Sequence, residues 1–380
     1  MIKCEDLRQV MAENDLTWFS GVPDSTFKEW ISYLNCRHGQ GLTNRISAIE
    51  RDAIGWAAGY HAATGKTGVV YMQNSGLGNV VNPLTSLADP EVYNIPILLM
   101  VGWRGEPGRP DEPQHIKMGK ITLPLLDVLG VKYGILPDNI EEAGKIIAEA
   151  KKYIDKTRGI YALIVRGGIF EEYGVKPEKE KYELAREEAI QMIIDSMSGA
   201  EIIVSTTGKT SRELFDYREK KNTCHQNDFL MVGSMGLASS FGAEIALQKP
   251  EKKVFIFDGD GAIIMSAGVL STIGYYAPRN LYHIVFDNES HDSTGGQPTT
   301  SQSIDFENLA LANNYRGAKA VKTKEELEKA LLQIKEKEGP QMLVIKVKKG
   351  SRKDLGRPTV TPGENKKAFM RYLKTKDERP

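Results

Sequence analysis

Short apolar runs of strand length alternate with stretches of helical period along most of the chain, and this alternation limits the possible folds more than any other feature. A strand, a helix and a second strand of the same direction form the repeating unit of parallel sheets. In the first half the predicted strands are 17–20, 44–49, 68–72, 95–101, 131–136 and 160–165. The predicted helices between them are 26–34, 51–64, 76–88 and 140–155. The pattern predicts the α/β class, with a mostly parallel sheet that has helices on both faces.

The alternation stops in a charge-dense passage, residues 171–188, and then begins again. A passage of this kind is typical of a linker. Beyond it the predicted strands are 201–205, 253–257, 282–287 and 342–348, and the predicted helices are 211–217, 237–248, 263–276, 306–313 and 324–337. We therefore predict a first domain over 1–175, a linker over 176–188 and a second domain over 189–350, with no middle domain. Residues 351–380 are expected to form a tail that wraps over the surface or frays.

Charge and cysteine content exclude several classes of function. Fifty Lys and Arg balance fifty Asp and Glu, so neither nucleic acid nor an anionic membrane is expected as the main partner. The longest apolar runs, such as 95–101, are too short to span a bilayer. Cys4, Cys36 and Cys224 lie far apart in the sequence and are typical of a protein in a reducing compartment. We expect a soluble cytoplasmic protein.

One segment of the second half predicts a metal and phosphate site. A buried-strand pattern ends in residues 259–261 (Gly-Asp-Gly), and a second apolar strand ends just before Asn288. Twenty-six residues separate this tripeptide from Asn288, enough for one helix and a return strand. Asp260 and Asn288 are therefore expected side by side at the carboxyl edge of a parallel sheet, where ligands of such sheets bind. Their oxygens suit Mg²⁺ or Ca²⁺, and the N–H groups of Gly261 and Ala262 favour a phosphate.

This spacing resembles the signature of thiamine diphosphate enzymes, in which Gly-Asp-Gly is followed at a similar distance by Asn-Asn. Here Asp287 replaces the first Asn, and Asn288 retains the second. The resemblance implies two cofactors, thiamine diphosphate and Mg²⁺. It also implies that Asp260, Asn288 and the backbone carbonyl of Ser290 hold the metal that bridges the diphosphate.

Two further segments are expected to contact the cofactor. Residues 233–236, Gly-Ser-Met-Gly, resemble the segment around the aminopyrimidine ring. By this resemblance Met235 is the apolar wedge beneath the bent cofactor, and the Gly233 carbonyl accepts from its 4′-amino group. Gly208 lies in a loop that follows a predicted strand and opens a helix, so it is expected to contact the diphosphate.

A glutamate in the first half completes the expected cofactor site. Glu50 ends a strand pattern, begins a helical one and lies among apolar residues that would raise its pKa. In the enzymes that the chain resembles, such a carboxylate bonds N1′ of the pyrimidine and activates C2. The alternative is a first-turn glutamate that only complements the helix dipole. The resemblance also implies that Glu50 and the metal site meet across subunits, in a homo-oligomer that is at least a dimer.

The two-domain layout is similar to that of the phosphonopyruvate and sulfopyruvate decarboxylases, and this resemblance covers nearly the whole chain. The segments that carry it are 21–25, 71–79, 82–93, 102–108, 111–115 and 291–299. They favour the phosphonopyruvate branch of the family. The implied reaction is the non-oxidative decarboxylation of 3-phosphonopyruvate to phosphonoacetaldehyde through an ylid and an enamine of the cofactor, as in phosphonate biosynthesis.

The same resemblance implies residues that handle a small anionic 2-oxo acid. Ser25 and His115 are the candidates for catalytic proton transfer. The residues expected near the substrate are Asp24, Asn74, Arg104 and His291. Because a phosphonate needs cationic or N–H partners, Arg104, Arg109 and Lys117 are expected on a loop that closes over the site.

Departures from the family pattern leave other substrates open. Ile49 and Arg51 flank Glu50 where Asn and Gly are usual, Leu237 replaces a His, and Glu289 replaces a Gly and adds negative charge near the expected site. The alternatives are a sulfopyruvate decarboxylase and a decarboxylase or carboligase of another 3-substituted 2-oxo acid. From a different class comes a non-catalytic thiamine-diphosphate-binding protein.

Overall fold

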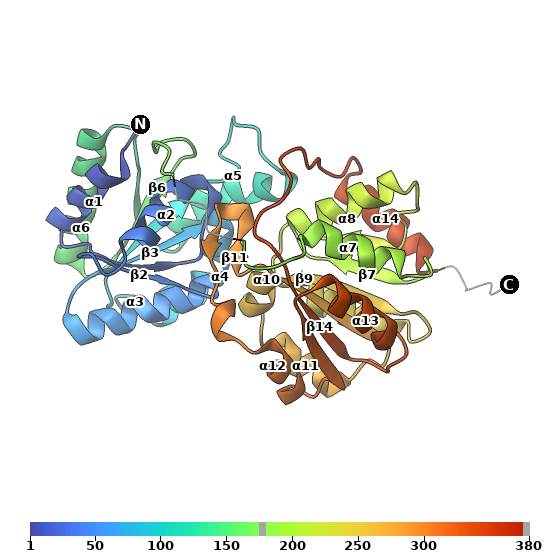
Figure 1. Cartoon of the computed structure of the whole chain (residues 1–380). Helices are drawn as coiled ribbons and strands as arrows, with labels where there is room; N and C mark the ends of the chain where they lie inside the picture. Colours follow the sequence, from blue (N-terminus) through green and yellow to red (C-terminus); the bar gives the residue numbers. More distant parts are fainter. Residues whose placement is uncertain (175–179, 375–380) are drawn as a thin grey trace. The chain divides into compact units, whose positions relative to one another are not determined.

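The computed structural model describes residues 1–174 and 180–374, which form two compact units (Figure 1). The first unit comprises residues 1–174 and 291–298, and the second comprises 180–290 and 299–374. Part of the predicted linker, 176–179, and the last part of the predicted tail, 375–380, lie outside the described residues.

The first unit is built on a six-stranded sheet. Its strands are β1 (Trp18–Gly21), β2 (Thr43–Ile46), β3 (Gly68–Gln73), β4 (Ile97–Gly102), β5 (Lys132–Ile135) and β6 (Ile160–Val165). Its helices are α1 (Cys4–Glu13), α2 (Lys28–Arg37), α3 (Glu50–Thr64), α4 (Leu77–Ser86), α5 (Pro113–Val128) and α6 (Ile140–Thr157), with short 3₁₀ turns η1 (Ser25–Phe27) and η2 (Asn74–Gly76). The strand order is β2-β1-β3-β4-β6-β5, and neighbouring strands are parallel.

Both faces of this sheet are covered by helices, which explains why its central strands are apolar throughout. Every residue of β4 and β6 is buried. Helices α1, α2 and α6 pack on one face around Phe19, Tyr71 and Met100. Helices α3, α4 and α5 pack on the other face around Val70 and Leu99.

The second unit is built on another six-stranded sheet. Its strands are β7 (Ile202–Ser205), β8 (Asp228–Leu230), β9 (Val254–Gly259), β10 (Leu281–Asp287), β13 (Gly317–Val321) and β14 (Gln341–Lys346). Its helices are α7 (Arg186–Asp195), α8 (Lys209–Lys220), α9 (Ala238–Gln248), α10 (Asp260–Met265), α11 (Val269–Tyr276), α12 (Phe306–Ala312), α13 (Lys324–Ile334) and α14 (Pro362–Tyr372). The remaining short elements are β11 (Ser290–His291), η3 (Asp292–Thr294), β12 (Gln297–Pro298) and η4 (Ser301–Ser303).

The second sheet repeats the topology of the first. Its order is β13-β14-β10-β9-β7-β8, again with parallel neighbours. When the six strands of each sheet are numbered along the chain, both sheets have the order 2-1-3-4-6-5. Helices α7, α8 and α13 cover one face, and α9 to α12 with α14 cover the other. The predicted α/β class, with two parallel sheets and helices on both faces, is confirmed.

Several elements differ from the sequence prediction. Helix α5 replaces part of the expected loop, because burial of Thr122 and Leu126 outweighs the helix-weakening Gly119 and Pro124. Helices α1, α5, α7 and α14 and strands β8 and β13 were not predicted, and the expected helix 263–276 is divided into α10 and α11. No helix among the described residues is long and apolar enough to cross a membrane.

The described part of the C-terminal tail contains a packed helix rather than a frayed end. Thr361 and Glu364 form a capping box at the start of α14, which fixes its first turn. Phe369 is buried in the core of the second unit. Asn365 donates to the carbonyl of Asp228 over 2.8 Å and accepts from the N–H of Leu230 over 3.0 Å. Helix α14 therefore binds the backbone of β8, the edge strand of the second sheet.

Candidate active site

The predicted site residues lie at the carboxyl ends of four neighbouring strands in each sheet. In the second sheet β8, β7, β9 and β10 lead into the loops that carry Gly233 and Met235, Gly208, Asp260 and Gly261, and Asn288 and Ser290. In the first sheet β2, β1, β3 and β4 lead to Glu50, Asp24 and Ser25, Asn74, and Arg104. The helices that follow the first two strands of each sheet pack on opposite faces, as at a topological switch point, where open α/β sheets bind ligands.

Asp260 and Asn288 follow adjacent parallel strands. Both side chains are buried. Asp260 Oδ2 accepts from Thr299 Oγ1 over 2.5 Å, and Asn288 Oδ1 accepts from Ser290 N over 3.0 Å. Burial and then the charge of Asp287 raise the pKa of Asp260 to about 7, so this carboxylate lacks compensating positive charge.

The donors at this edge fit a hard divalent cation. A carboxylate, an amide oxygen and a backbone carbonyl are oxygen ligands of the kind that Mg²⁺ takes. The Ser290 hydroxyl is buried and has no hydrogen-bond partner within the described ranges. The described residues contain no cluster of three or more His, Cys, Asp or Glu that could hold a metal, so a cation here would need amide, carbonyl and ligand oxygens as well.

The loops after β7 and β8 lie against each other beside this edge. The N–H of Gly233 donates to Thr207 Oγ1 over 2.9 Å. Gly208 precedes α8 with φ 97° and ψ −137°, a conformation that favours glycine because glycine has no Cβ. Gly236 has φ +87°, and an added Cβ would lie 2.3 Å from Ser266 Oγ. The partly exposed Met235 is held in this tight turn, so its thioether fits the role of an apolar wedge.

Glu289 does not add free negative charge, contrary to the expectation from its sequence. Its carboxylate forms ion pairs with Lys181 and Lys346 and accepts from the Tyr182 hydroxyl. Burial acts to raise its pKa, but the bonds from Lys181 and Tyr182 outweigh burial and hold the pKa below the usual range. Its backbone has φ +59°, which costs a non-glycine residue about 1–2 kcal/mol. The hydrogen bond from Tyr182 and the ion pair with Lys346, whose side chain is 16% exposed, favour this conformation and act against that cost.

Glu50 is the first residue of α3, and its side chain is buried. Burial raises the pKa of Glu50, and a hydrogen bond from Asn79 Nδ2 to Oε2, 2.7 Å long, partly counters this effect. Gly76 faces the other oxygen, because an added Cβ would lie 2.5 Å from Oε1. A buried carboxyl group whose neutral form is favoured suits the sharing of a proton with a ring nitrogen.

Arg104 is engaged by a carboxylate on its own loop. Its Nε lies 2.8 Å from Asp111 Oδ2, and its Nη2 lies 2.5 Å from Oδ1. Its Nη1 donates to Ser25 Oγ over 2.9 Å.

Arg109 and Arg166 both pair with Glu106. The sequence predicted Arg104 and Arg109 as cationic partners of a phosphonate. In the structure both guanidinium groups are instead paired with carboxylates of the protein. The exposed Lys117 lies on α5 rather than on the loop.

His115 and Asn74 belong to the same polar group. Burial and then the charge of Arg104 lower the pKa of His115, so its imidazole is neutral at neutral pH. Its Nδ1 is buried without a hydrogen-bond partner in the described part of the chain. Asn74 donates to the carbonyl of Arg104 over 2.8 Å and to Thr122 Oγ1 over 2.9 Å, so it fastens the Arg104 loop to α5.

Asp24 directly precedes Ser25 and is fully buried. Its Oδ1 accepts from Gln73 Nε2 over 2.8 Å, whereas its buried Oδ2 has no hydrogen-bond partner in residues 1–174 and 180–374. Burial raises the pKa of Asp24. A Cβ at Gly102 would lie 1.7 Å from Oδ2, so glycine is required there.

His291 begins a segment, residues 291–298, that groups with the first unit although it follows β10. Gln297 Nε2 lies 3.4 Å from the carbonyl of Lys28 and 3.4 Å from Ser32 Oγ, both on α2. The predicted second domain, 189–350, therefore differs from the observed unit at this segment. His291 shares a unit with Ser25 and His115.

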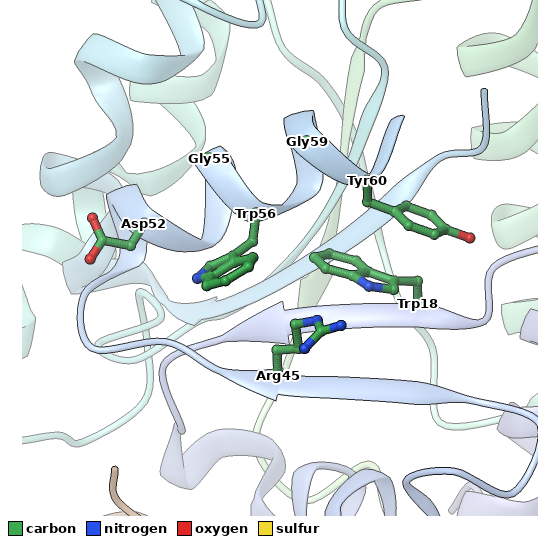
Figure 2. Close-up of a pocket in the computed structure, with 7 residues that line it drawn as sticks. All are labelled: Trp18, Arg45, Asp52, Gly55, Trp56, Gly59 and Tyr60. Carbon is green, nitrogen blue, oxygen red and sulfur yellow. The ribbon is translucent and has the colours of Figure 1, made fainter. Parts of the chain in front are cut away.

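An open pocket of about 500 Å³ lies between α3 and the strands β1 and β2 (Figure 2). Trp56 and Tyr60 extend from the helix toward Trp18 and Arg45, which come from β1 and β2. Tyr60 stacks on Trp18 at 4.9 Å, and Arg45 lies 5.6 Å from the Trp56 ring. Glu50 does not line this pocket, so the pocket belongs to the surface of the unit rather than to the expected cofactor site.

Sequence reasoning missed the partners that hold the site residues. Asn79 and Gly76 fix Glu50, Asp111 fixes Arg104, and Thr299 bonds Asp260. A signal was present for all four partners, since they belong to the segments 71–79, 111–115 and 291–299 that carry the family resemblance. Nothing in the sequence indicated which carboxylate would pair with Arg104.

Two family models match this chain, one in each of its two units. The family described as thiamine pyrophosphate enzyme, N-terminal TPP binding domain, matches residues 4–121, and the corresponding C-terminal TPP binding domain matches residues 206–345. A phosphonopyruvate decarboxylase of Streptomyces viridochromogenes is 35% identical, covering 99% of this chain and 96% of that protein. Another from Streptomyces hygroscopicus is 32% identical, covering 98% and 94%. A sulfopyruvate decarboxylase of Methanosarcina acetivorans is 28% identical, covering 86% and 87%.

These similarities extend over both units and include the strand ends that carry the site residues. They confirm the resemblance found in the sequence. The chain therefore belongs to the phosphonopyruvate decarboxylase family of thiamine pyrophosphate enzymes.

Proposed function

We propose that this chain catalyses the non-oxidative decarboxylation of 3-phosphonopyruvate to phosphonoacetaldehyde and CO₂, as in phosphonate biosynthesis. The observation that carries the proposal is the identity to a phosphonopyruvate decarboxylase over nearly the full length of both chains. The sulfopyruvate decarboxylase relative is less similar and covers less of the chain. The cytoplasmic location expected from the composition stays a prediction.

We infer that thiamine diphosphate binds with Mg²⁺ at the carboxyl edge of the second sheet. The metal donors would be Asp260, Asn288 and the Ser290 carbonyl, and the cofactor contacts would come from Gly208, Gly233, Met235, Gly261 and Ala262. Their support is the buried, uncompensated Asp260 carboxylate and the glycine-rich loops beside it. When bound, the cofactor supplies the electron sink that allows the bond between the carboxylate and the keto carbon to break.

The chain's own residues would position and move protons. Glu50, with its raised pKa, would share a proton with N1′ of the pyrimidine. Ser25 Oγ already accepts from Arg104, so its own O–H is free to be donated to the substrate. His115, neutral near pH 7, would accept or return a proton through its unpaired Nδ1. Asp24, Asn74 and His291 would border the same space.

We further infer that the active unit is at least a homodimer, with the surface around the pocket between α3 and strands β1 and β2 against a second copy. Trp56 is 54% exposed although it is a large apolar residue, and it lines the pocket shown in Figure 2. An exposed apolar patch on a folded unit commonly marks an interaction surface. Since α3 begins with Glu50, this contact would fix the helix that carries the expected catalytic carboxylate.

Trp56→Glu should convert the dimer to a monomer, because a buried charge would replace an apolar side chain at the contact. Sedimentation velocity measures the change. Leu332→Glu is the matched control, since Leu332 is 76% exposed on α13 of the second unit and does not line the pocket. A dimer that persists in Trp56→Glu would show that this face is not the interface.

A substrate panel tests the proposed reaction. The enzyme reconstituted with thiamine diphosphate and Mg²⁺ is incubated with phosphonopyruvate, sulfopyruvate and pyruvate, and CO₂ and aldehyde are measured. The highest kcat/KM is expected for phosphonopyruvate. Preference for another acid would overturn the substrate, a ligated product formed with added aldehyde would indicate a carboligase, and cofactor binding without turnover of any acid would favour a binding protein.

A further inference from the structure

Glu289 occupies an unusual backbone position between two of the proposed metal donors. It lies between Asn288 and Ser290 with φ +59°, in the left-handed region that favours glycine. Its carboxylate contacts the segment that precedes α7: Lys181 Nζ lies 2.9 Å from Oε1 and 2.8 Å from Oε2. Tyr182 donates its hydroxyl to Oε1.

A second lysine connects Glu289 to the residue on the other side of Asn288. Lys346, on β14, lies 2.5 Å from Asp287 Oδ2 and 3.5 Å from Glu289 Oε1. The side chains of Asp287 and Glu289 are 0% and 4% exposed, and that of Lys346 is 16% exposed. The charges of two carboxylates and two ammonium groups therefore balance around the turn. Asp260, by contrast, has no cationic partner among the described residues.

We propose that Glu289 is a positioning residue for the divalent cation. Held by Lys181, Tyr182 and Lys346, its side chain keeps the Asn288–Ser290 turn in the shape that presents the Asn288 oxygen and the Ser290 carbonyl to the metal. We call these contacts of Glu289 with Lys181, Tyr182 and Lys346 the clamp. Through the clamp, residues 181 and 182 influence metal affinity directly. This inference rests on the proposed metal site at Asp260 and Asn288.

The clamp explains how this chain tolerates a glutamate where related sequences have glycine. Glycine adopts a positive φ without help, whereas glutamate requires side-chain bonds that favour this conformation. Removing those bonds while keeping a Cβ should release the turn. Removing the Cβ as well should let the turn keep its shape. Alanine and glycine at position 289 therefore have different expected effects, and this difference separates positioning from simple loss of charge.

The test measures Mg²⁺ binding by calorimetry at saturating thiamine diphosphate. Partners that orient metal ligands typically change metal affinity by about 10–100-fold when removed, so Glu289→Ala is expected to weaken Mg²⁺ binding by such a factor. Glu289→Gly should recover most of that loss, and Lys181→Met should reproduce part of it. At saturating Mg²⁺, kcat should remain near that of the unsubstituted protein.

The matched control is Glu338→Ala, which removes another carboxylate of the second unit that pairs with two arginines, Arg279 and Arg316. It should leave Mg²⁺ affinity unchanged. Equal Mg²⁺ affinity in Glu289→Ala, Lys181→Met and the unsubstituted protein would overturn the clamp, as would equal losses in Glu289→Ala and Glu289→Gly. Asp260→Ala distinguishes failure of the clamp from failure of the proposed metal site. Retained Mg²⁺ binding in that variant would overturn the metal site itself, whatever the position 289 variants show.

Discussion

Asp260→Ala is expected to abolish Mg²⁺-dependent binding of thiamine diphosphate. The substitution removes the one carboxylate of the proposed donor set and leaves neutral amide and carbonyl oxygens, which hold Mg²⁺ weakly without a charged ligand. We expect the dissociation constant of the cofactor, measured by calorimetry with Mg²⁺, to rise at least about 100-fold. Asp354→Ala is the control, because Asp354 is exposed in the same unit.

The pH dependence of stability provides an independent measurement on the same residue. The pKa of Asp260 is about 7 in the folded protein, above the ordinary value of 3.8 for an aspartate. Its contribution to stability is therefore fully present below pH 3.8 and is lost as the pH rises through 7. Without metal, Asp260→Asn should remove this loss and raise the Tm above pH 7 relative to the parent. An unaltered cofactor dissociation constant in Asp260→Ala would refute the ligand assignment.

Glu50→Gln is expected to lower kcat by about 10²–10⁴-fold, the usual contribution of a positioned acid or base. Glutamine keeps the shape of the side chain and can still bond Asn79, but it cannot exchange a proton with N1′ at neutral pH. Cofactor binding should therefore change much less than turnover. Single-turnover kinetics and calorimetry measure the two quantities, and Glu91→Gln, at an exposed site of the first unit, is the control.

The same variant should stabilise the protein while inactivating it. Burial raises the pKa of Glu50 above the ordinary value of 4.5 for a glutamate, so the ionised form destabilises the fold as the pH rises. The gain in Tm for Glu50→Gln should be absent near pH 4 and should increase at higher pH. Tight cofactor binding with unchanged turnover would contradict the proposed role of Glu50 at N1′.

The positions of the main site residues could be predicted because they follow from parallel strands. Asp260 and Asn288 end consecutive strands joined by one helix, and such strands meet with their carboxyl ends at one edge. Glu50 was found in the same way, as a polar residue between a strand pattern and a helical pattern. Their roles in binding and catalysis remain proposals that the experiments above test.

Side-chain partners could not be predicted in this way. Arg104 is seven residues before Asp111, a spacing with no regular period, and their pairing depends on how the loop folds against α5. Glu289 was expected to repel an anion because the sequence does not reveal that Lys181 and Tyr182, more than one hundred residues earlier, take its charge. Helix α5 escaped prediction because tertiary packing overrides the weak helix propensity of Gly119 and Pro124.

The repeated 2-1-3-4-6-5 topology gives the two halves separate opportunities to evolve. Each sheet is closed by its own cores on both faces, so the loops at its edge can change without altering the strands below them. In the first half those loops carry Glu50 and most of the expected substrate residues, and in the second they carry the expected metal and diphosphate contacts. A lineage could thus acquire a new acid preference through substitutions in loops of the first half, while the inherited metal and diphosphate loops of the second stayed intact.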